Sequence, residues 1–580
     1  MVLDRAAAGW PRWAALALGV LSVLVGLVLL TRPFASLTVL ILLVAAGFIL
    51  SGVDDLADRR EATDPQVPTV TGIAWIVAGV AVLVWPGLSL RVVAVVVGIA
   101  LIVSGGSRVL TAIRGDTDQR AAAIMLGAAS VVLGIVALAW PDVTILVVAV
   151  VFGVRLALFG LARIGDAIRG PQTDAAASPT RQGRLGRWAK TAGAAVALVL
   201  SLAILLVSTR LNEGGPTVDA FYTPPSDVPP QPGRLLRSEP FGRAIPAGAQ
   251  VWRILYTSTR ADGVPATASA LVAAPAVLPQ GPRPVIAWAH GTTGVDQTCA
   301  PSLLPTGIES GSPNAIDQVI AKGWVMVATD YIGLGTEGRH AYLVGEQAGR
   351  SVLDAIRAAR QMPELSLSGQ AVVWGHSQGG GAALWTGILA PTYAADANVI
   401  GVAALSPASN LPAFADLLDE FPGGAVFESF VAQGYTDTYP DVRFGEYVRP
   451  TAQIQAREIA GRCFGEPRSL VSVVQSLFFD KAIWARDPLT GPLGVRLQEN
   501  VPSGPIDAPL LIGQGEADTI ILPTAQAAYV QARCDTGYPV DYRTYPGDHI
   551  TVVEPDSPLI PELIAWTQDR LDGRPAGSTC

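Results

Sequence analysis

The stretch AVVWGHSQGG, from Ala371 to Gly380, carries the pattern that most restricts the architecture of this 580-residue chain. A β-type apolar run, AVVW, leads into G-x-S-x-G, formed by Gly375, Ser377 and Gly379, and the small-residue helical run GGAALWTGILA follows. A serine on a tight strand-to-helix turn is held exposed above a sheet, and small neighbours let the chain pass closely. The order predicts a nucleophile elbow with Ser377 as the nucleophile.

Strand-like and helical runs alternate around this turn. The strand-like runs are PVIAWAH, GWVMVATD, AVVWGH, VIGVAALS, PLLIGQG and VDYRTYP, and the helical runs are EQAGRSVLDAIRAARQM and PTAQAAYVQARC. This alternation predicts an α/β domain with a parallel sheet and helices on both faces. Between SPASN and PLLIGQG lie about a hundred residues, more than a crossover needs. We expect a helical cap over residues 412–505, whose apolar runs either line an acyl pocket or form the cap's own core.

A serine hydroxyl needs a histidine to take its proton, and the chain has only 4 histidines. His376 adjoins the nucleophile and cannot fold back onto it. His340 precedes the helix before the elbow and is interpreted as structural. His290 comes too early, because α/β domains with a nucleophile elbow carry their catalytic residues in the chain order Ser, Asp, His. His549, after the last strand, is therefore the predicted base.

The acid must follow a strand between Ser377 and His549, where GQGEADTIIL offers Glu516 and Asp518. Asp518 is predicted, because it lies far enough beyond the strand for a loop to carry its carboxylate under the histidine. Asp548 is a poorer candidate, since a residue adjacent to the histidine points away from its ring nitrogen.

The tetrahedral intermediate of acyl transfer needs backbone N–H donors. One candidate is the N–H of Gln378, directly after the nucleophile, and the other lies in HGTTG after an earlier strand, at Gly291 or Thr292. The residues leave the choice between those two open, and HGTTG as a mere turn is the competing interpretation.

The first two hundred residues have the composition of membrane-spanning segments. Half of the whole chain is hydrophobic and its mean hydropathy is +0.41. The length of each apolar run is close to the ~20 residues that a helix needs to cross a bilayer. The 7 runs cover residues 13–31, 36–53, 69–85, 92–110, 121–139, 143–162 and 191–208. A signal peptide is the alternative for the first run, but it lacks a small-residue cleavage site.

The first six runs form three copies of one hairpin, with Pro33, Pro86 and Pro141 at the tips, which is an internal repeat. Over about residues 10–170 this unit resembles the short-repeat membrane family associated with bacterial acid resistance. Arg155 is the charge well inside a run. It is either a functional residue or a snorkelling or buried helix contact. We expect an anchoring or assembly role for this half.

Arginines in the short loops predict the orientation in the membrane. One side carries Arg5, Arg12, Arg59, Arg60, Arg114, Arg120 and the basic loop ending at Lys190, and the other carries Arg32 and Arg91. The amino terminus is therefore predicted to be cytoplasmic, and seven spans place everything after about residue 209 outside.

The cysteine positions and the net charge indicate which disulfides, metals and partners the chain can have. All 4 cysteines fall in the half predicted to lie outside, where oxidation favours disulfides, and by position we expect Cys299–Cys463 and Cys534–Cys580. No Cys/His cluster has metal-ligand spacing, so no metal or other cofactor is expected. A net charge of -8 and the lack of a nucleic-acid motif argue against nucleic acid as a partner.

Several motifs in the second half together mark a family resemblance. They are AFYTPPSDVPPQPGRLLRSEPF, AWAHGTTG with CAPS after it, DYIGLG, GHSQGG, GQGEADTIILP and GDH. Over about residues 216–580 they resemble the secretory lipase family, the lipase A type of yeasts. The resemblance implies an α/β-hydrolase fold with a helical cap, hydrolysis of carboxylic esters including acylglycerols, and a triad of Ser377, Asp518 and His549. The yeast enzymes tend to have Tyr and Gly where His376 and Gln378 stand here.

The expected organisation is a six-helix repeat domain over residues 1–170, a basic cytoplasmic loop and seventh transmembrane helix over 171–211, and a hydrolase domain over 212–580. The favoured function is a membrane-tethered extracytoplasmic serine lipase or esterase. One alternative is an acyltransferase with the same triad. Another is a membrane stress-response module whose hydrolase domain is not catalytic.

Overall fold

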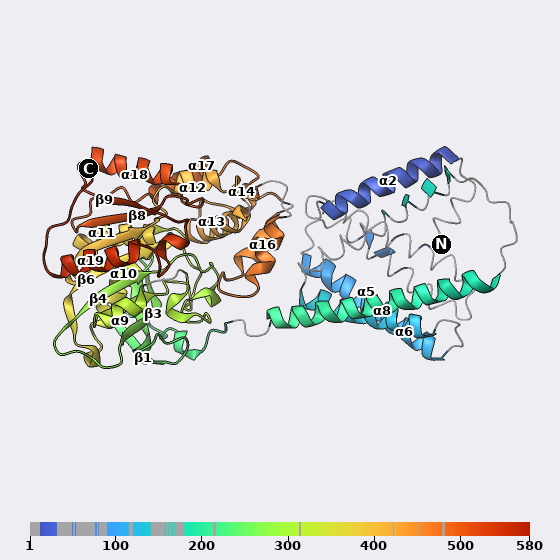
Figure 1. The fold of residues 1–580 in the computed structure, drawn as a ribbon, viewed down its shortest axis with the longest axis horizontal. Helices are drawn as coiled ribbons and strands as arrows, with labels where there is room; N and C mark the ends of the chain where they lie inside the picture. Colours follow the sequence, from blue (N-terminus) through green and yellow to red (C-terminus); the bar gives the residue numbers. More distant parts are fainter. Residues whose placement is uncertain are drawn as a thin grey trace. The chain divides into compact units, whose positions relative to one another are not determined.

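We describe the protein from a computed structural model (Figure 1). The structure describes residues 12–31, 90–114, 120–140, 179–212, 216–311, 315–421, 423–450, 452–477 and 482–580, with scattered positions between 49 and 168. The chain divides into two compact units, one built from Met1–Glu213 and the other from Gly214–Ser476 and Lys481–Cys580.

A nine-stranded sheet forms the centre of the second unit, in the order β1-β2-β3-β5-β4-β6-β7-β8-β9. The strands are β1 Leu235–Phe241, β2 Ala249–Thr259, β3 Pro265–Pro275, β4 Arg283–Ala289, β5 Val325–Thr329, β6 Leu367–His376, β7 Val399–Leu405, β8 Leu510–Gly515 and β9 Asp541–Tyr545. All six predicted strands are present, as β4 to β9, and they pair in parallel. The sheet as a whole is mixed, because β1, β2 and β3, which were not predicted, add an antiparallel edge.

Helices cover both faces of this sheet (Figure 1). On one face lie α10 Gly345–Ala359, α11 Gln378–Tyr393 and α18 Pro523–Asp535, and on the other lie α9 Ile316–Ala321 and α19 Leu559–Leu571. Apolar residues of the central strands alternate between the two faces: Val373 packs with the first set of helices and Trp374 with the second. Burial of both faces explains why these strands are almost continuously apolar.

The long segment between β7 and β8 is helical, as expected for a cap. Its helices are α12 Leu411–Leu417, α13 Gly424–Thr438, α14 Phe444–Tyr447, α15 Gln453–Ala460, α16 Ser469–Leu477 and α17 Gly491–Glu499. The predicted disulfide Cys299–Cys463 is confirmed, and it links the chain just after α15 to the region that follows β4.

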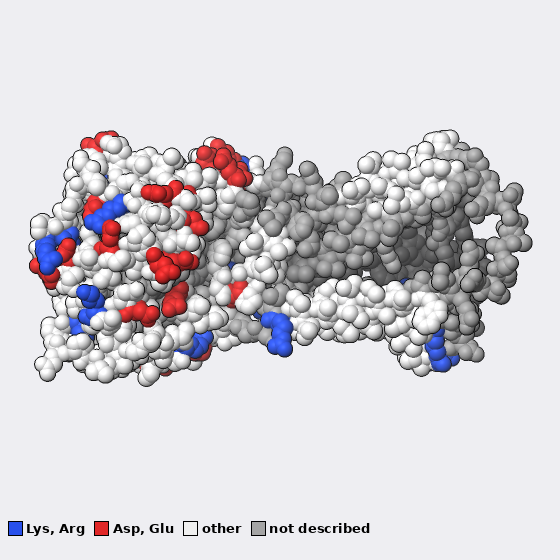
Figure 2. Space-filling view, viewed as in Figure 1, with Lys and Arg blue, Asp and Glu red and all other residues white. Residues whose placement is uncertain are grey.

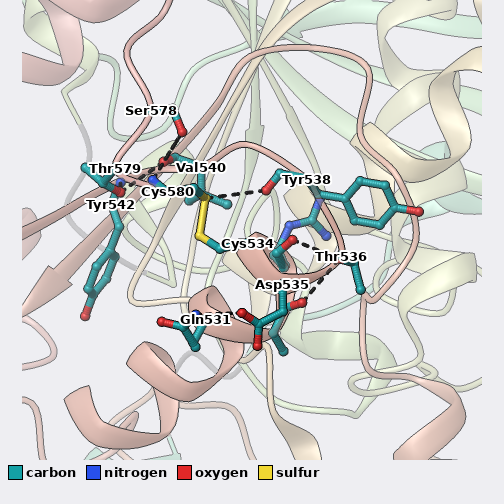
Figure 3. Close-up of a disulfide and its surroundings, with 12 residues drawn as sticks. Gln531, Cys534, Asp535, Thr536, Tyr538, Val540, Tyr542, Ser578, Thr579 and Cys580 are labelled. Atoms are coloured by element: carbon teal, nitrogen blue, oxygen red, sulfur yellow. Dashed lines mark hydrogen bonds between the residues drawn. A yellow bond between two sulfur atoms is a disulfide. The ribbon is translucent and has the colours of Figure 1, made fainter.

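The second predicted disulfide, Cys534–Cys580, is also confirmed, and it fastens the carboxyl terminus to α18 (Figure 3). Next to it the N–H of Thr579 donates to the carbonyl of Val540 at 2.7 Å, and the N–H of Tyr542 donates to the Thr579 hydroxyl at 3.0 Å. The last residues of the chain therefore bind along the start of β9.

The described helices of the first unit coincide with four of the seven predicted runs. They are α2 Arg12–Thr31, α5 Leu90–Arg114, α6 Arg120–Ala139 and α8 Pro179–Asn212. The other three runs, the proline tips and Arg155 lie mostly or wholly outside the described residues. Among the described helices, segments Arg120–Ala139 and Thr191–Arg210 are long and apolar enough to cross a bilayer.

The segment predicted as a basic loop before the last run is helical from Pro179, where α8 begins. Proline suits the first turn of a helix, and the three arginines that follow are good helix formers. The basic segment is thus a helical extension of the last apolar run.

Glycines hold α5 and α6 in close contact. A Cβ built on Gly127 would lie 2.7 Å from the carbonyl oxygen of Gly105, and one on Gly134 would lie 2.7 Å from that of Gly98. Such backbone approach through small residues is typical of helices packed in lipid. On the face shown in Figure 2, the described surface of this unit is almost free of charged side chains, whereas charged side chains are scattered over the second unit.

Candidate active site

Ser377 occupies a strained turn between β6 and α11. Its backbone angles are φ 58° and ψ -121°, outside the regions that non-glycine residues normally adopt. The flanking glycines make the turn possible, since a Cβ on Gly375 would lie 2.0 Å from the carbonyl oxygen of Gly379, and one on Gly379 would lie 1.9 Å from that of Ala289. The strand-turn-helix geometry predicted for the GHSQGG motif is therefore present.

Three residues that are far apart in sequence form one hydrogen-bonded chain. Ser377 Oγ lies 2.8 Å from His549 Nε2, and His549 Nδ1 lies 2.8 Å from Asp518 Oδ2. A carboxylate only accepts, so His549 donates through Nδ1 and its Nε2 accepts the Ser377 hydroxyl. The residues follow β6, β9 and β8 respectively, at the carboxyl ends of parallel strands, where α/β sheets place their sites.

The carboxylate of Asp518 is surrounded by hydrogen-bond donors. Besides His549, its carboxylate accepts the N–H of Ile520 at 2.9 Å, the N–H of Ile521 at 2.8 Å and the side-chain amide of Gln514 at 3.2 Å. Burial alone would raise the pKa of Asp518, but His549 and these backbone donors outweigh burial, so the pKa lies below its usual value. The carboxylate is therefore ionised at neutral pH.

The two other carboxylates weighed from the sequence lie elsewhere. Glu516 is exposed and accepts from the Thr544 hydroxyl at 3.3 Å. Asp548 is exposed and caps the turn after the histidine by accepting the N–H groups of Ile550 and Thr551. Neither carboxylate has a hydrogen bond to His549 in the described structure.

The oxyanion candidates lie on two segments that meet near the nucleophile turn, the start of α11 and the loop after β4. Gln378 is the first residue of α11, whose amino-terminal end carries a partial positive charge. Gly291 follows β4 in a crowded position, since a Cβ there would lie 2.2 Å from the carbonyl oxygen of Gly311 and 3.5 Å from Nδ1 of His376. Thr292 is tied by its hydroxyl to that of Tyr342 at 2.9 Å. The backbone N–H groups of Gln378 and of Gly291 or Thr292 stay the predicted oxyanion donors.

Two histidines that were not predicted to take part in catalysis also lie in this site. His376 Nε2 is 2.8 Å from the backbone carbonyl oxygen of His549, and His340 Nε2 is 2.7 Å from the side-chain nitrogen of Gln378. Burial, followed by the nearness of another histidine, lowers the pKa of each ring to about 3, so both are neutral. No sequence signal marks these contacts, because each joins residues that are 173 or 38 positions apart.

Comparison with known families separates the same two halves. Residues 312–579 match the secretory lipase family. Residues 17–63, 70–128 and 125–207 match a short repeat of unknown function, DUF308. Both resemblances predicted from the sequence are confirmed.

Individual relatives extend the lipase match beyond the family segment. Lipase A of Moesziomyces aphidis is 25% identical over 390 residues, covering 62% of this chain and 82% of the relative. Lipase 10 of Candida albicans is 26% identical over 430 residues, covering 66% and 87%. A secreted triacylglycerol lipase of Malassezia globosa is 27% identical over 400 residues, covering 63% and 83%.

A solved structure shares the fold of the second unit. The crystal structure of Candida antarctica lipase A in its closed state superposes with a TM-score of 0.54 at 21% identity, covering 62% of this chain and 87% of that one. An α/β-hydrolase-like sheet, a serine elbow and lipase relatives thus converge on one conclusion. Residues 312–579 match the secretory lipase family, the second unit shares the fold of a lipase, and the protein is a carboxylic ester hydrolase.

Proposed function

We propose that this protein is a membrane-tethered, extracytoplasmic serine lipase or esterase that cleaves carboxylic esters such as acylglycerols through Ser377, His549 and Asp518. The observation that carries the proposal is the continuous hydrogen-bonded chain from the Ser377 hydroxyl through His549 to the buried carboxylate of Asp518. A donor–acceptor order of this kind is what a serine nucleophile requires.

In the proposed acylation step, Ser377 Oγ attacks the ester carbonyl carbon while His549 Nε2 takes its proton. Asp518 holds the imidazole in the Nδ1–H tautomer and stabilises the imidazolium that forms. The negative oxygen of the tetrahedral intermediate accepts N–H bonds from Gln378 and from Gly291 or Thr292. When the intermediate collapses, the C–O bond to the alcohol breaks and His549 returns the proton to the leaving alkoxide.

In the proposed deacylation step, water replaces the alcohol. His549 takes a proton from the water as its oxygen attacks the acyl carbon, and it then protonates Ser377 Oγ as the carboxylic acid leaves. One ester and one water are thereby consumed, and one acid and one alcohol are released.

Three observations support tethering at the outer face of a membrane. The span-length segment Thr191–Arg210 ends only a few residues before the second unit starts, and several of its apolar side chains are exposed, with Val199 at 64% and Leu206 at 59%. Two disulfides belong to the second unit, which suits an oxidising compartment. The basic amino-terminal part of α8 marks the cytoplasmic end of that helix under the positive-inside rule.

The proposal is tested by assaying the full-length chain and its Ser377→Ala variant on glycerol esters of increasing acyl length. We expect turnover to fall by at least about 10³-fold in the variant, since removing a triad member leaves only binding and the oxyanion site. Product analysis in water and in added alcohol separates hydrolysis from acyl transfer. Full turnover by Ser377→Ala would refute the proposed nucleophile.

A further inference from the structure

His376 stands where the loop of the base meets the nucleophile turn. It is the last residue of β6, its side chain is 1% exposed, and its ring centre lies 4.7 Å from that of His549. Its Nε2 lies 2.8 Å from the backbone carbonyl oxygen of His549. A carbonyl oxygen can only accept, so the His376 ring carries its proton on Nε2 and donates.

The backbone around His549 is anchored at several points, of which His376 supplies the one at the histidine itself. The N–H of Ala517 donates to the carbonyl of Gly547 at 2.9 Å, and the N–H of Asp548 donates to the hydroxyl of Thr551 at 2.8 Å. These bonds hold the turn on either side of His549. The His376 bond holds the His549 peptide directly against the strand that ends at the nucleophile.

We propose that His376 is a positioning residue for the general base: its Nε2–H fixes the His549 backbone so that His549 Nε2 stays within reach of Ser377 Oγ. Because His376 and Ser377 are adjacent in the chain, the backbone that carries the nucleophile also holds the general base in place. The inference rests on the proposed triad, and it assigns to His376 a role that its place in the G-x-S-x-G motif does not reveal.

The role calls for a neutral donor rather than a charged one. A second positive charge 4.7 Å from the His549 ring would oppose the imidazolium that forms when the base takes a proton. The buried His376 ring supplies an N–H without a charge. Its other nitrogen, Nδ1, has no hydrogen-bond partner among the described residues.

Two matched substitutions separate the donor from the bulk of the side chain. His376→Gln keeps an N–H at the position of Nε2, whereas His376→Met has a similar length and no donor. Each variant of the full-length chain is titrated with an activated phosphonate ester that labels the serine, so that kcat is expressed per active site. Thermal unfolding is recorded in parallel.

We expect His376→Met to lower kcat on alkyl esters about tenfold with little change in KM, since a displaced base costs rate rather than binding. The loss should be smaller on p-nitrophenyl esters, whose leaving group departs without a proton from His549. His376→Gln should recover most of kcat. Equal kcat for Gln and Met, or an unchanged kcat per site in Met, would overturn the positioning role.

The Ser377→Ala variant is assayed beside them. If it loses turnover while His376→Met does not, only the positioning role fails. If Ser377→Ala turns over normally, the proposed triad fails and the role of His376 fails with it.

Discussion

At the scale of single residues, Asp518 is distinguished from its neighbours by the number of donors around it. It accepts from His549 and from the N–H groups of Ile520 and Ile521. We expect Asp518→Asn to lower kcat by about 10³–10⁴-fold, because an amide favours the wrong histidine tautomer. Glu516→Gln, at an exposed position two residues closer to β8, should retain near wild-type kcat. The reverse pattern in steady-state assays would show that Glu516 is the acid.

Glu428 on α13 is a buried carboxyl that the proposed chemistry does not use. It is fully buried and accepts the N–H of Ile483 at 2.9 Å. Burial, together with the nearby Asp419, raises its pKa from 4.5 to about 9. A carboxyl whose folded-state pKa is raised contributes stability that is fully present below its unfolded pKa and is lost as the pH rises towards the folded value.

This shift predicts how stability depends on pH between about 4.5 and about 9. Relative to the wild type, Glu428→Gln should become progressively more stable as the pH rises through this window, because the variant has no proton to lose. The measurement is the thermal unfolding midpoint at several pH values. Glu446→Gln, exposed on α14, is the control and should follow the wild type. If the unfolding midpoint of Glu428→Gln changed with pH in the same way as that of the wild type, the prediction would be contradicted.

At the scale of elements, β6 offers a test of why the elbow needs glycine. A Cβ at Gly375 would meet the carbonyl oxygen of Gly379 at 2.0 Å, whereas a Cβ at Gly369, earlier in the same strand, would have no neighbour within 4 Å. We expect Gly375→Ala to destabilise the protein by at least about 3 kcal/mol, because backbone rather than a flexible side chain must move. Gly369→Ala should change the unfolding midpoint little. Equal midpoints for the two variants would show that the turn can relax.

The elements of the second unit differ in how well their sequences predict them. Strands β4 to β8 are short apolar runs bounded by turn residues, whereas β9, DYRTY, is a short run with aromatic and β-branched residues. All six were predicted from these patterns. Strand β3, PATASALVAAP, is rich in alanine, which has low β-propensity, and it becomes a strand through eleven paired positions with β2. Its structure is therefore decided by tertiary pairing, and the same holds for the antiparallel edge that it joins.

At the scale of the whole molecule, the proposed topology makes a prediction about protease access. In right-side-out membrane vesicles, protease should reach residues 216–580, while an epitope placed at residues 171–178 should be protected until the vesicles are opened. The physical reason is that a helix such as Thr191–Arg210 crosses a bilayer once and separates the two segments. Protection of the hydrolase unit in right-side-out vesicles and its cleavage in inverted ones would reverse the assigned orientation.

The sequence alone determined those features that depend on neighbouring residues. Local backbone preferences and periodicity can be recognised from neighbouring residues. They are enough to predict the strand-turn-helix order around Ser377, the lengths of the apolar runs and the internal repeat. Elimination among four histidines, with the chain order of the fold, sufficed to predict His549 as the partner that the structure places 2.8 Å from Ser377.

Only the tertiary structure decided which distant groups meet. It brought His376 to the carbonyl of His549, paired His340 with Gln378, and placed β1 to β3 antiparallel at the sheet edge. Such contacts depend on the direction of each side chain after the whole sheet has closed on its helices. A hydrogen bond between residues 173 positions apart leaves no trace in the local pattern of either segment.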